Sequence, residues 1–419
     1  MSILELTSAI LSKMSDINKW QLEFLLHNFS HQCTIRGRHN FLNMARYSSK
    51  NESTYRENYA CPETSVGKDF DFAGFNLELI NSNLGKNKAV AFDPSYISKS
   101  GRKTPGCGYF WLGCAGMAKW GLEIGGFAAI DIDENTALRY IADQTLASNE
   151  HQSLLAYYAA LVCRRSADIL QVSKYLVVDA YFSRNPFVTT VCEQNIEVIS
   201  RLRDDADLRY LYVGPHQKKK GPKRKFQGKF DARNLDESHF SCFCIQKDES
   251  KNENFALYEG TLNSKALKRN IRVVVLHNFD KEGQIKNHKI FFSTDTTLSG
   301  IDMFLYYKTR FQIEFLYRDA KQFTGLEHCQ SRSETKLHFH FNTALTTVSL
   351  AKVAYHLAIP EEKRGAFSMA DIKTRYANEK IFDLIIEECA DLPNDQIIKS
   401  IEKVRAKIID LGKIHVRRA

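Results

Sequence analysis

Two short apolar runs, each closed by an aspartate, constrain the fold of this chain more than any other feature. AVAFD ends at Asp93 and KYLVVD ends at Asp179. Uninterrupted apolar runs of this length are typical of buried strands in a sheet that helices cover on both faces. An acid after one such strand is commonly a turn residue or a helix cap. Two acids at the carboxyl ends of neighbouring parallel strands would instead lie close together.

The order of elements around these runs predicts an α/β fold. KAVAFDPSYI reads as a first strand, and GYFWLGCAGMAKWGLEIGGFAAIDID reads as two more strands joined by a turn near Met117–Trp120. A helix over NEHQSLLAYYAALVCRRSADIL, the KYLVVD strand, a helix over NPFVTTVCEQN and a strand over IEVISRLRDDA follow. This is the order of an RNase H-like domain, a mixed sheet with flanking helices in which the first and fourth strands are parallel neighbours.

The rest of the chain falls into segments of different pattern. We predict a helical DNA-binding module over 1–60, the first part of the RNase H-like catalytic domain over 61–210, a β-rich insertion with a basic loop over 211–290, the last part of the catalytic domain over 291–358, and a C-terminal helical region over 359–419. The C-terminal region is a candidate for dimerisation, and its amphipathic pattern equally fits packing against the core.

Basic residues gather in two of these segments. The first segment contributes Arg38, Arg46 and Arg56, which fit a small helical DNA-binding module as well as a plain helical cap. The insertion contains QKKKGPKRKFQGK, whose cations are Lys218, Lys219, Lys220, Lys223, Arg224 and Lys225. Such a run is either a solvated loop or a contact for phosphates that does not depend on base sequence.

A third acid joins the two aspartates. Glu314 lies on a later helix, and three carboxylates within a few ångströms would raise one another's pKa unless a cation lay among them. Two Mg²⁺ ions, for which Mn²⁺ can substitute, would remove the repulsion and supply the usual chemistry for phosphodiester cleavage. We therefore predict Asp93, Asp179 and Glu314 as catalytic and metal-binding residues.

Other acids compete less well for that role. Asp131, Asp133, Asp204 and Asp205 follow strands whose ends point away from the junction of the first and fourth strands. Asp295 precedes the Glu314 helix, and we expect it to cap that helix rather than to support the metal ions.

The segment around Glu314, YYKTRFQIEFLYRDAK, carries a polar stripe. Tyr307, Arg310, Glu314, Arg318 and Lys321 follow one another at helical spacing and would share one side of a single helix. A solvated charged face is the simplest interpretation. If Glu314 reaches the metal ions, the stripe would instead contact the phosphates of a DNA strand, because arginine and lysine match phosphate oxygens.

Composition limits the class of protein. No apolar run approaches the length of a membrane span, and the ten cysteines include no CxxC pair. The net charge of +9 suits a nucleic-acid partner. We expect a soluble, cytoplasmic protein that associates with the nucleoid.

The spacing Tyr307-x2-Arg310-x3-Glu314-x6-Lys321 resembles the Y-R-E-K signature of bacterial insertion-sequence DDE transposases. Asp93 in FDPSYISKSGRKTPG and Asp179 in VVDAYFS resemble the first and second catalytic aspartates of that family. The resemblance covers roughly residues 85–355, with a weaker likeness over 36–60 to the family's DNA-binding helices.

The resemblance implies a cut-and-paste transposase with an RNase H-like domain and two Mg²⁺ ions. Such an enzyme nicks the transposon end, forms and reopens a hairpin, and joins the 3′ end to target DNA. Its partners would be double-stranded DNA and a second copy of the chain in a synaptic complex. The sequence departs from the family in one respect, since Trp20, Trp111 and Trp120 all lie outside the insertion, where relatives stack a flipped base on tryptophan.

Two alternatives remain at this level. One is a catalytically silent DNA-binding protein, a repressor or architectural factor derived from a transposase. The other is an RNase H-like nuclease that recognises branched DNA structure and not a transposon end.

Overall fold

The central sheet of the computed structural model has the strand order of an RNase H-like domain. The structure describes residues 1–15, 17–59, 70–146, 153–215, 223–248, 253–388, 401, 404–405 and 408–409. The antiparallel strands are β1 (Lys88–Ser98), β3 (Met117–Asp131) and β4 (Thr136–Gln144), and β5 (Tyr175–Val177) and β6 (Glu197–Leu202) continue in parallel. The spatial order β4-β3-β1-β5-β6 confirms the predicted α/β fold.

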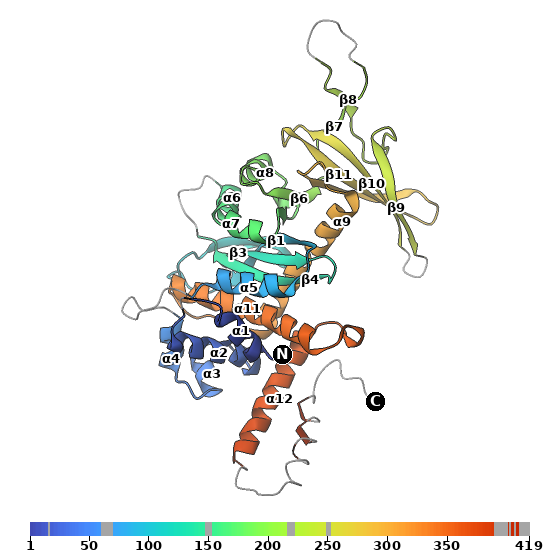
Figure 1. The fold of residues 1–419 in the computed structure, drawn as a ribbon. Coiled ribbons are helices and arrows are strands. Elements are labelled where there is room, and N and C mark those ends of the chain that lie inside the picture. Colours follow the sequence, from blue (N-terminus) through green and yellow to red (C-terminus); the bar gives the residue numbers. More distant parts are fainter. Residues whose placement is uncertain are drawn as a thin grey trace.

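Side chains alternate between two cores on the faces of this sheet. On β1, Val90 and Phe92 join the core formed with helices α6 (Leu154–Arg164), α7 (Ser166–Val172) and α8 (Asn185–Cys192). Ala89 and Ala91 join the other core, which packs against helices α9 (Gly300–Thr309) and α10 (Gln312–Phe323). Figure 1 shows α6, α7 and α8 on one side of the sheet and helix α11 (Glu334–Ala358) on the other.

Helix side chains satisfy the backbone of β4. The amide of Asn342 on α11 accepts a hydrogen bond from the Ala142 N–H at 2.8 Å and donates to the Ala142 carbonyl at 2.9 Å. Asn76, on helix α5 (Phe72–Asn83), donates to the carbonyl of Tyr140, and the Arg139 N–H donates to the Ser349 hydroxyl. These contacts fix α5 and α11 along β4.

The insertion extends the same sheet. Its strands are β7 (Leu208–Leu211), β8 (Phe226–Lys229), β9 (Phe240–Asp248), β10 (Glu253–Ser264), β11 (Arg269–Phe279) and β12 (Ile285–Ser293). β12 pairs antiparallel with β6, so the insertion is hydrogen-bonded directly to the central sheet, from which it projects at the top of Figure 1. The β-rich character predicted for this part of the chain is therefore correct.

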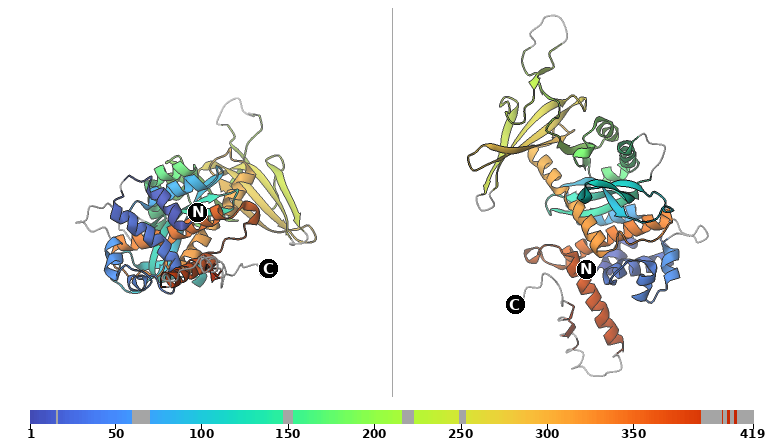
Figure 2. Two further views of the ribbon diagram at one scale, coloured as in Figure 1. Left: turned by 60° about the horizontal axis from the view of Figure 1, so that its bottom comes forward. Right: turned by 180° about the vertical axis from the view of Figure 1, so that it is seen from behind.

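Helices fill both ends of the described chain. α1 (Ile3–Leu11), α2 (Lys19–Thr34), α3 (Phe41–Arg46) and α4 (Glu52–Asn58) form the N-terminal group, and α12 (Met369–Glu388) projects from the body beside it (Figure 2). None of the helices in the described part of the chain combines the length and apolar character needed to cross a membrane.

Several predicted elements are wrong in detail. The predicted helix from Tyr306 to Lys321 is two helices, because α9 ends at Thr309 and α10 begins at Gln312. Asp93 lies in the middle of β1 and does not end it. The predicted turn at Met117–Trp120 belongs to β3, and the 3-10 turn η1 (Gly113–Ala115) joins it to β2 (Gly108–Leu112). We did not predict β4.

Candidate active site

Strand pairing brings the two aspartates together. Ala91 of β1 lies beside Val177 of β5 in parallel register, and each aspartate follows its strand partner by two residues. Ala91 and Val177 belong to the core beneath α10. Because side chains repeat every second residue in a strand, Asp93 faces the same side of the sheet as Ala91. The register thus directs Asp93 toward Asp179 and α10.

Hydrogen bonds hold the backbone at both aspartates. The Tyr317 hydroxyl of α10 donates to the Asp93 carbonyl at 2.6 Å. The Asp179 carboxylate accepts from the Tyr181 N–H at 2.9 Å as the cap of a 3-10 turn, η2 (Ala180–Phe182), and the Ser200 hydroxyl donates to the Asp179 carbonyl at 2.7 Å. These bonds leave the Asp93 carboxylate free to face the third acid.

Glu314 completes the group from the first turn of α10. Arg310, between α9 and α10, donates to the Glu314 carboxylate at 3.1 Å. Its guanidinium also acts electrostatically on both Asp93 and Asp179. Arg310 is therefore the cation that three carboxylates share in this structure, and the positive end of the α10 dipole adds to its effect.

Burial and mutual repulsion shift the titration of the aspartates. Burial raises the pKa of Asp93 to about 7, with further increases from the neighbouring Asp179 and Glu314 and an opposing effect from Arg310. Burial also raises the pKa of Asp179. A carboxyl group of this kind is stabilised by any added cation.

The acidic group fits a hard divalent cation in its chemistry. All three donors are carboxylate oxygens, the ligands that Mg²⁺ and Mn²⁺ prefer. Among the residues that the structure describes, no three acidic, histidine or cysteine side chains stand close enough to hold an ion as they are now oriented. Instead of a metal ion, the Arg310 guanidinium balances part of the negative charge of the carboxylates.

The remaining residues of the stripe diverge where the helix breaks. Tyr307 on α9 packs against Phe291 with ring centroids 4.9 Å apart, and Arg310 lies over the Tyr307 ring. Lys321 on α10 donates to the Tyr96 carbonyl at 2.7 Å. Arg318 is exposed and bonds to Asp319 next to it in sequence. Tyr307 and Arg310 thus border the acids. Lys321 lies farther along α10, where it also pairs with Glu327 at 3.4 Å, and Arg318 turns toward solvent.

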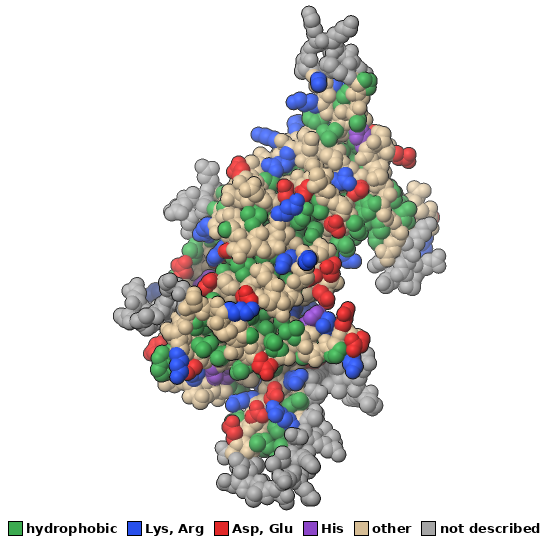
Figure 3. Space-filling model, viewed as in Figure 1, with side chains coloured by type: hydrophobic (Ala, Val, Ile, Leu, Met, Phe, Trp, Pro, Cys, Tyr) green, Lys and Arg blue, Asp and Glu red, His purple; other side chains and the backbone are tan. Residues whose placement is uncertain are grey.

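The predicted basic residues lie away from the acids. Lys223, Arg224 and Lys225 are exposed beside β8 in the insertion, where Figure 3 shows Lys and Arg side chains on the surface. Lys218, Lys219 and Lys220 lie outside the described residues. Arg38, Arg46 and Arg56 are exposed on the N-terminal helices and the loop before α3.

The competing acids have structural partners. Asp131 accepts hydrogen bonds from the backbone of Gly85 and Asp133. Asp204 pairs with His288, and Asp205 with Arg203. The expectation that Asp295 caps a helix is wrong: Ser299 caps α9, while Asp295 binds Lys174 at 2.8 Å and Tyr175 at 2.9 Å.

Sequence reasoning missed a buried arginine beside Asp93. Arg139 of β4 is completely buried, and among the described residues none offers a hydrogen-bond partner to its three guanidinium nitrogens, while the guanidinium lies over the Tyr317 ring at 5.1 Å. Gly126 is the β3 partner of Asp93, and a Cβ atom there would lie 1.9 Å from an Arg139 nitrogen and 2.0 Å from the Tyr317 hydroxyl. Arg139 therefore occupies the space that a side chain at position 126 would fill. In the sequence, Arg139 stands out only as a charged residue within the segment ALRYIA.

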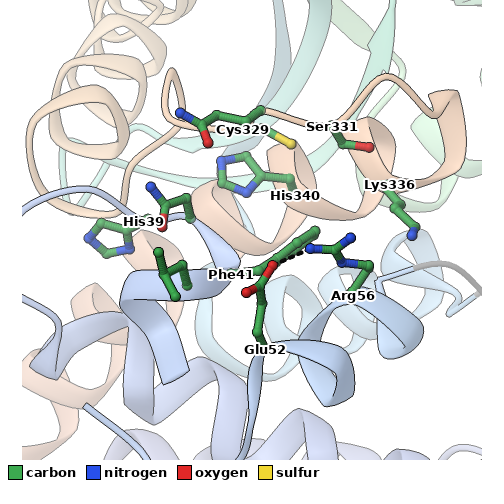
Figure 4. Close-up of a pocket in the computed structure, with 11 residues that line it drawn as sticks. His39, Phe41, Glu52, Arg56, Cys329, Ser331, Lys336 and His340 are labelled. Carbon is green, nitrogen blue, oxygen red and sulfur yellow. Dashed lines mark hydrogen bonds and ion pairs between the residues drawn. The ribbon is translucent and has the colours of Figure 1, made fainter. Parts of the chain in front are cut away.

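A pocket separates the N-terminal helices from the catalytic domain. Its volume is about 320 Å³. Figure 4 shows the Glu52–Arg56 ion pair of α4 on one side and Cys329, Lys336 and His340 on the other. The side chain of Arg56 is thus directed toward the junction of the two parts.

Comparison with known proteins gives two findings. The family model described as Transposase DDE domain matches residues 139–350, a range that includes Asp179 and Glu314. A solved structure similar to the chain is a cryo-EM piggyBac transposase synaptic complex with hairpin DNA, at 11% identity and a TM-score of 0.41 over 99% of this chain and 84% of that one. A search of curated proteins finds no match.

Proposed function

Because the chain belongs to the family defined by the transposase DDE domain, we propose that it is a cut-and-paste DNA transposase of the insertion-sequence type. It would excise its element and join it to target DNA by phosphodiester hydrolysis and strand transfer, through a hairpin intermediate. The proposal rests mainly on one observation. Asp93, Asp179 and Glu314 all interact electrostatically with the Arg310 guanidinium.

The three carboxylates would hold two Mg²⁺ ions, or Mn²⁺ in their place. Bound metal ions would activate a water or 3′-hydroxyl for attack on the phosphodiester and stabilise the departing 3′ oxygen. Asp93 and Asp179 come from adjacent strands whose register is fixed, so their separation is set by the sheet. Glu314 comes from the first turn of α10, and the Arg310 side chain holds its carboxylate.

Arg310 would couple DNA binding to this arrangement. Its guanidinium now makes a single contact with Glu314, and a DNA phosphate would bind it through two parallel hydrogen bonds. When phosphate replaces Glu314 at Arg310, the carboxylate is released to face the two aspartates. Tyr307, beside the acids, and Lys321, farther along α10, would hold the DNA backbone.

The outer parts of the chain would add affinity. Exposed cations on the insertion and on the N-terminal helices would contact phosphates of the transposon end. The C-terminal helical region would support a homodimer, because both ends of an element must be cut together. The protein would act in the cytoplasm, at the nucleoid.

Cleavage of supercoiled plasmid that carries the element's own ends tests the proposal. Wild type should release the element with Mg²⁺ and not with EDTA, and Glu314→Gln should lower the rate by about 100-fold or more, since metal-assisted charge stabilisation supplies most of the catalysis. Glu334→Gln, on an exposed acid of α11, is the matched control and should cut normally.

The other outcomes identify the alternatives. Tight DNA binding without cleavage under any metal would favour a repressor or architectural protein. Cleavage of branched DNA with no preference for the element's ends would favour a structure-specific nuclease.

A further inference from the structure

A hairpin next to the candidate active site carries exposed aromatic side chains. β2 and the start of β3 pair antiparallel, with Tyr109 opposite Trp120 and Trp111 opposite Ala118. Paired residues share one face of a sheet, so Tyr109, Trp111 and Trp120 form one surface, here called the aromatic hairpin face. Their exposed fractions are 74%, 65% and 36%. Three exposed aromatic rings on one short hairpin are unusual for a surface with no partner.

The aromatic hairpin face lies on the same side of the sheet as the candidate catalytic acids. Trp120 follows the two-residue period that places Leu122 and Ile124 in the core beneath α10. The same period reaches Gly126, the partner of Asp93. At about 3.3 Å per residue, the six residues from Gly126 to Trp120 span roughly 20 Å. This is roughly the length of six nucleotides of a B-form strand.

Hydrogen bonds join the hairpin to the candidate active site. Lys321 of α10 donates to the Tyr96 carbonyl, and the Tyr96 hydroxyl donates to the Trp120 carbonyl, each at 2.7 Å. The Trp120 indole N–H donates to the Gly101 carbonyl at 3.2 Å, and Tyr109 meets the Trp120 ring edge to face at 5.4 Å. The aromatic hairpin face is therefore held in place and is continuous with the helix that carries Glu314.

The charge of this segment indicates the partner. Between Pro94 and Leu122 the chain has four cations and no acid. The cations are Lys99, Arg102, Lys103 and Lys119, of which the last three are exposed. Aromatic rings interleaved with cations on an acid-free surface suit unpaired nucleic acid, since every base offers a flat face and every nucleotide a phosphate.

We propose that the aromatic hairpin face stacks unpaired nucleobases of the DNA strand that leaves the candidate active site. Bases within a duplex are already stacked on one another, so only a separated end or a flipped base can lie against these rings. The inference rests on the proposed function for the presence of such an end. It places the base-stacking tryptophans on the β2–β3 hairpin, which lies outside the insertion.

Tryptophan fluorescence tests this directly and does not require cleavage. The three tryptophans are Trp20, Trp111 and Trp120, and Trp20 is exposed on α2. In a Trp20→Phe background, a duplex with a single-stranded tail of about six nucleotides should quench the emission, and a blunt duplex of the same sequence should quench it much less. Trp111→Ala should weaken binding of the tailed duplex by about tenfold and leave the blunt duplex unaffected. Trp20→Ala is the matched control and should change neither.

The outcomes separate this inference from the proposed function. Equal quenching by tailed and blunt DNA, or none by either while DNA still binds, would overturn it. Quenching that depends on protein concentration without DNA would assign the face to a second copy of the chain and also overturn it. The fluorescence response is measured in EDTA, where no cleavage takes place, so a failure of catalysis leaves this test intact.

Discussion

At the scale of single residues, the charge on Asp93 opposes folding. Burial raises its pKa from 3.8 to about 7, so between these values the folded chain binds more protons than the unfolded chain. The free energy of unfolding must then fall as pH rises from about 4 to 7. We expect Asp93→Asn, in EDTA, to show a shallower fall over this range in urea denaturation. Asp205→Asn, an exposed acid that pairs with Arg203, should keep the wild-type slope, and the same slope in both variants would contradict the prediction.

Gly126 has a role that only the absence of a side chain can fill. Gly126→Ala would place a carbon within 2.0 Å of both the Arg139 guanidinium and the Tyr317 hydroxyl. Because backbone and core must shift, we expect a loss of about 1–3 kcal/mol in the free energy of unfolding. Gly228→Ala is the matched control, since no atom of the described residues lies within 4 Å of its added carbon. Equal stability of the two variants would show that Arg139 moves away at no cost.

Some residues of the candidate site could be proposed from the sequence, and others could not. Asp93, Asp179 and Glu314 could be found because apolar runs and a fixed spacing mark them. Arg139 could not, because its importance comes from its burial and from the pairing of Gly126 with Asp93, which are properties of the sheet register. The contacts of Arg139 with Asp93 and with the Tyr317 ring cannot be read from the sequence pattern alone.

At the scale of elements, side chains of α11 complete the hydrogen bonding of β4. Asn342 satisfies both the N–H and the carbonyl of Ala142. Asn342→Leu would leave both backbone groups buried and unpaired, so we expect a loss of about 2–5 kcal/mol in the free energy of unfolding. Thermal and urea denaturation would measure it, with Asn263→Leu on the exposed surface of β10 as control. A loss below about 1 kcal/mol would mean that β4 finds other partners.

The secondary-structure predictions were wrong where tertiary contacts, and not the local sequence pattern, determine the structure. TALRYIADQ contains an arginine and an aspartate and was not predicted as a strand, yet it is β4, because helix side chains complete its hydrogen bonds. The polar stripe follows helical spacing through Arg310, yet the chain leaves regular helix there, where Arg310 turns to the acids. The order of the larger elements was predictable because it depends on apolar runs alone.

At the scale of the whole molecule, a half-buried lysine joins distant parts of the chain. Lys373 of α12 donates to the Phe323 carbonyl at 2.6 Å and contacts the His39 ring at 3.0 Å. Burial lowers the pKa of Lys373 from 10.5 to about 8. Between these values the unfolded chain binds more protons, so the free energy of unfolding should rise with pH. We expect Lys373→Met to flatten that rise in denaturation between pH 8 and 10, whereas Lys19→Met, on an exposed residue, should not. An unchanged slope in Lys373→Met would contradict the assignment.

The pairing of β12 with β6 has a mechanical consequence. β12 ends at Ser293 and the chain enters α9 at Gly300, so few residues separate the insertion from the helix that leads to Arg310 and Glu314. An insertion joined by a free linker could tilt independently, but this one is stiffened by its own ladder of backbone bonds to β6. The insertion would therefore move as one body with β6, and any such movement would reach α9 through the short connection that follows Ser293.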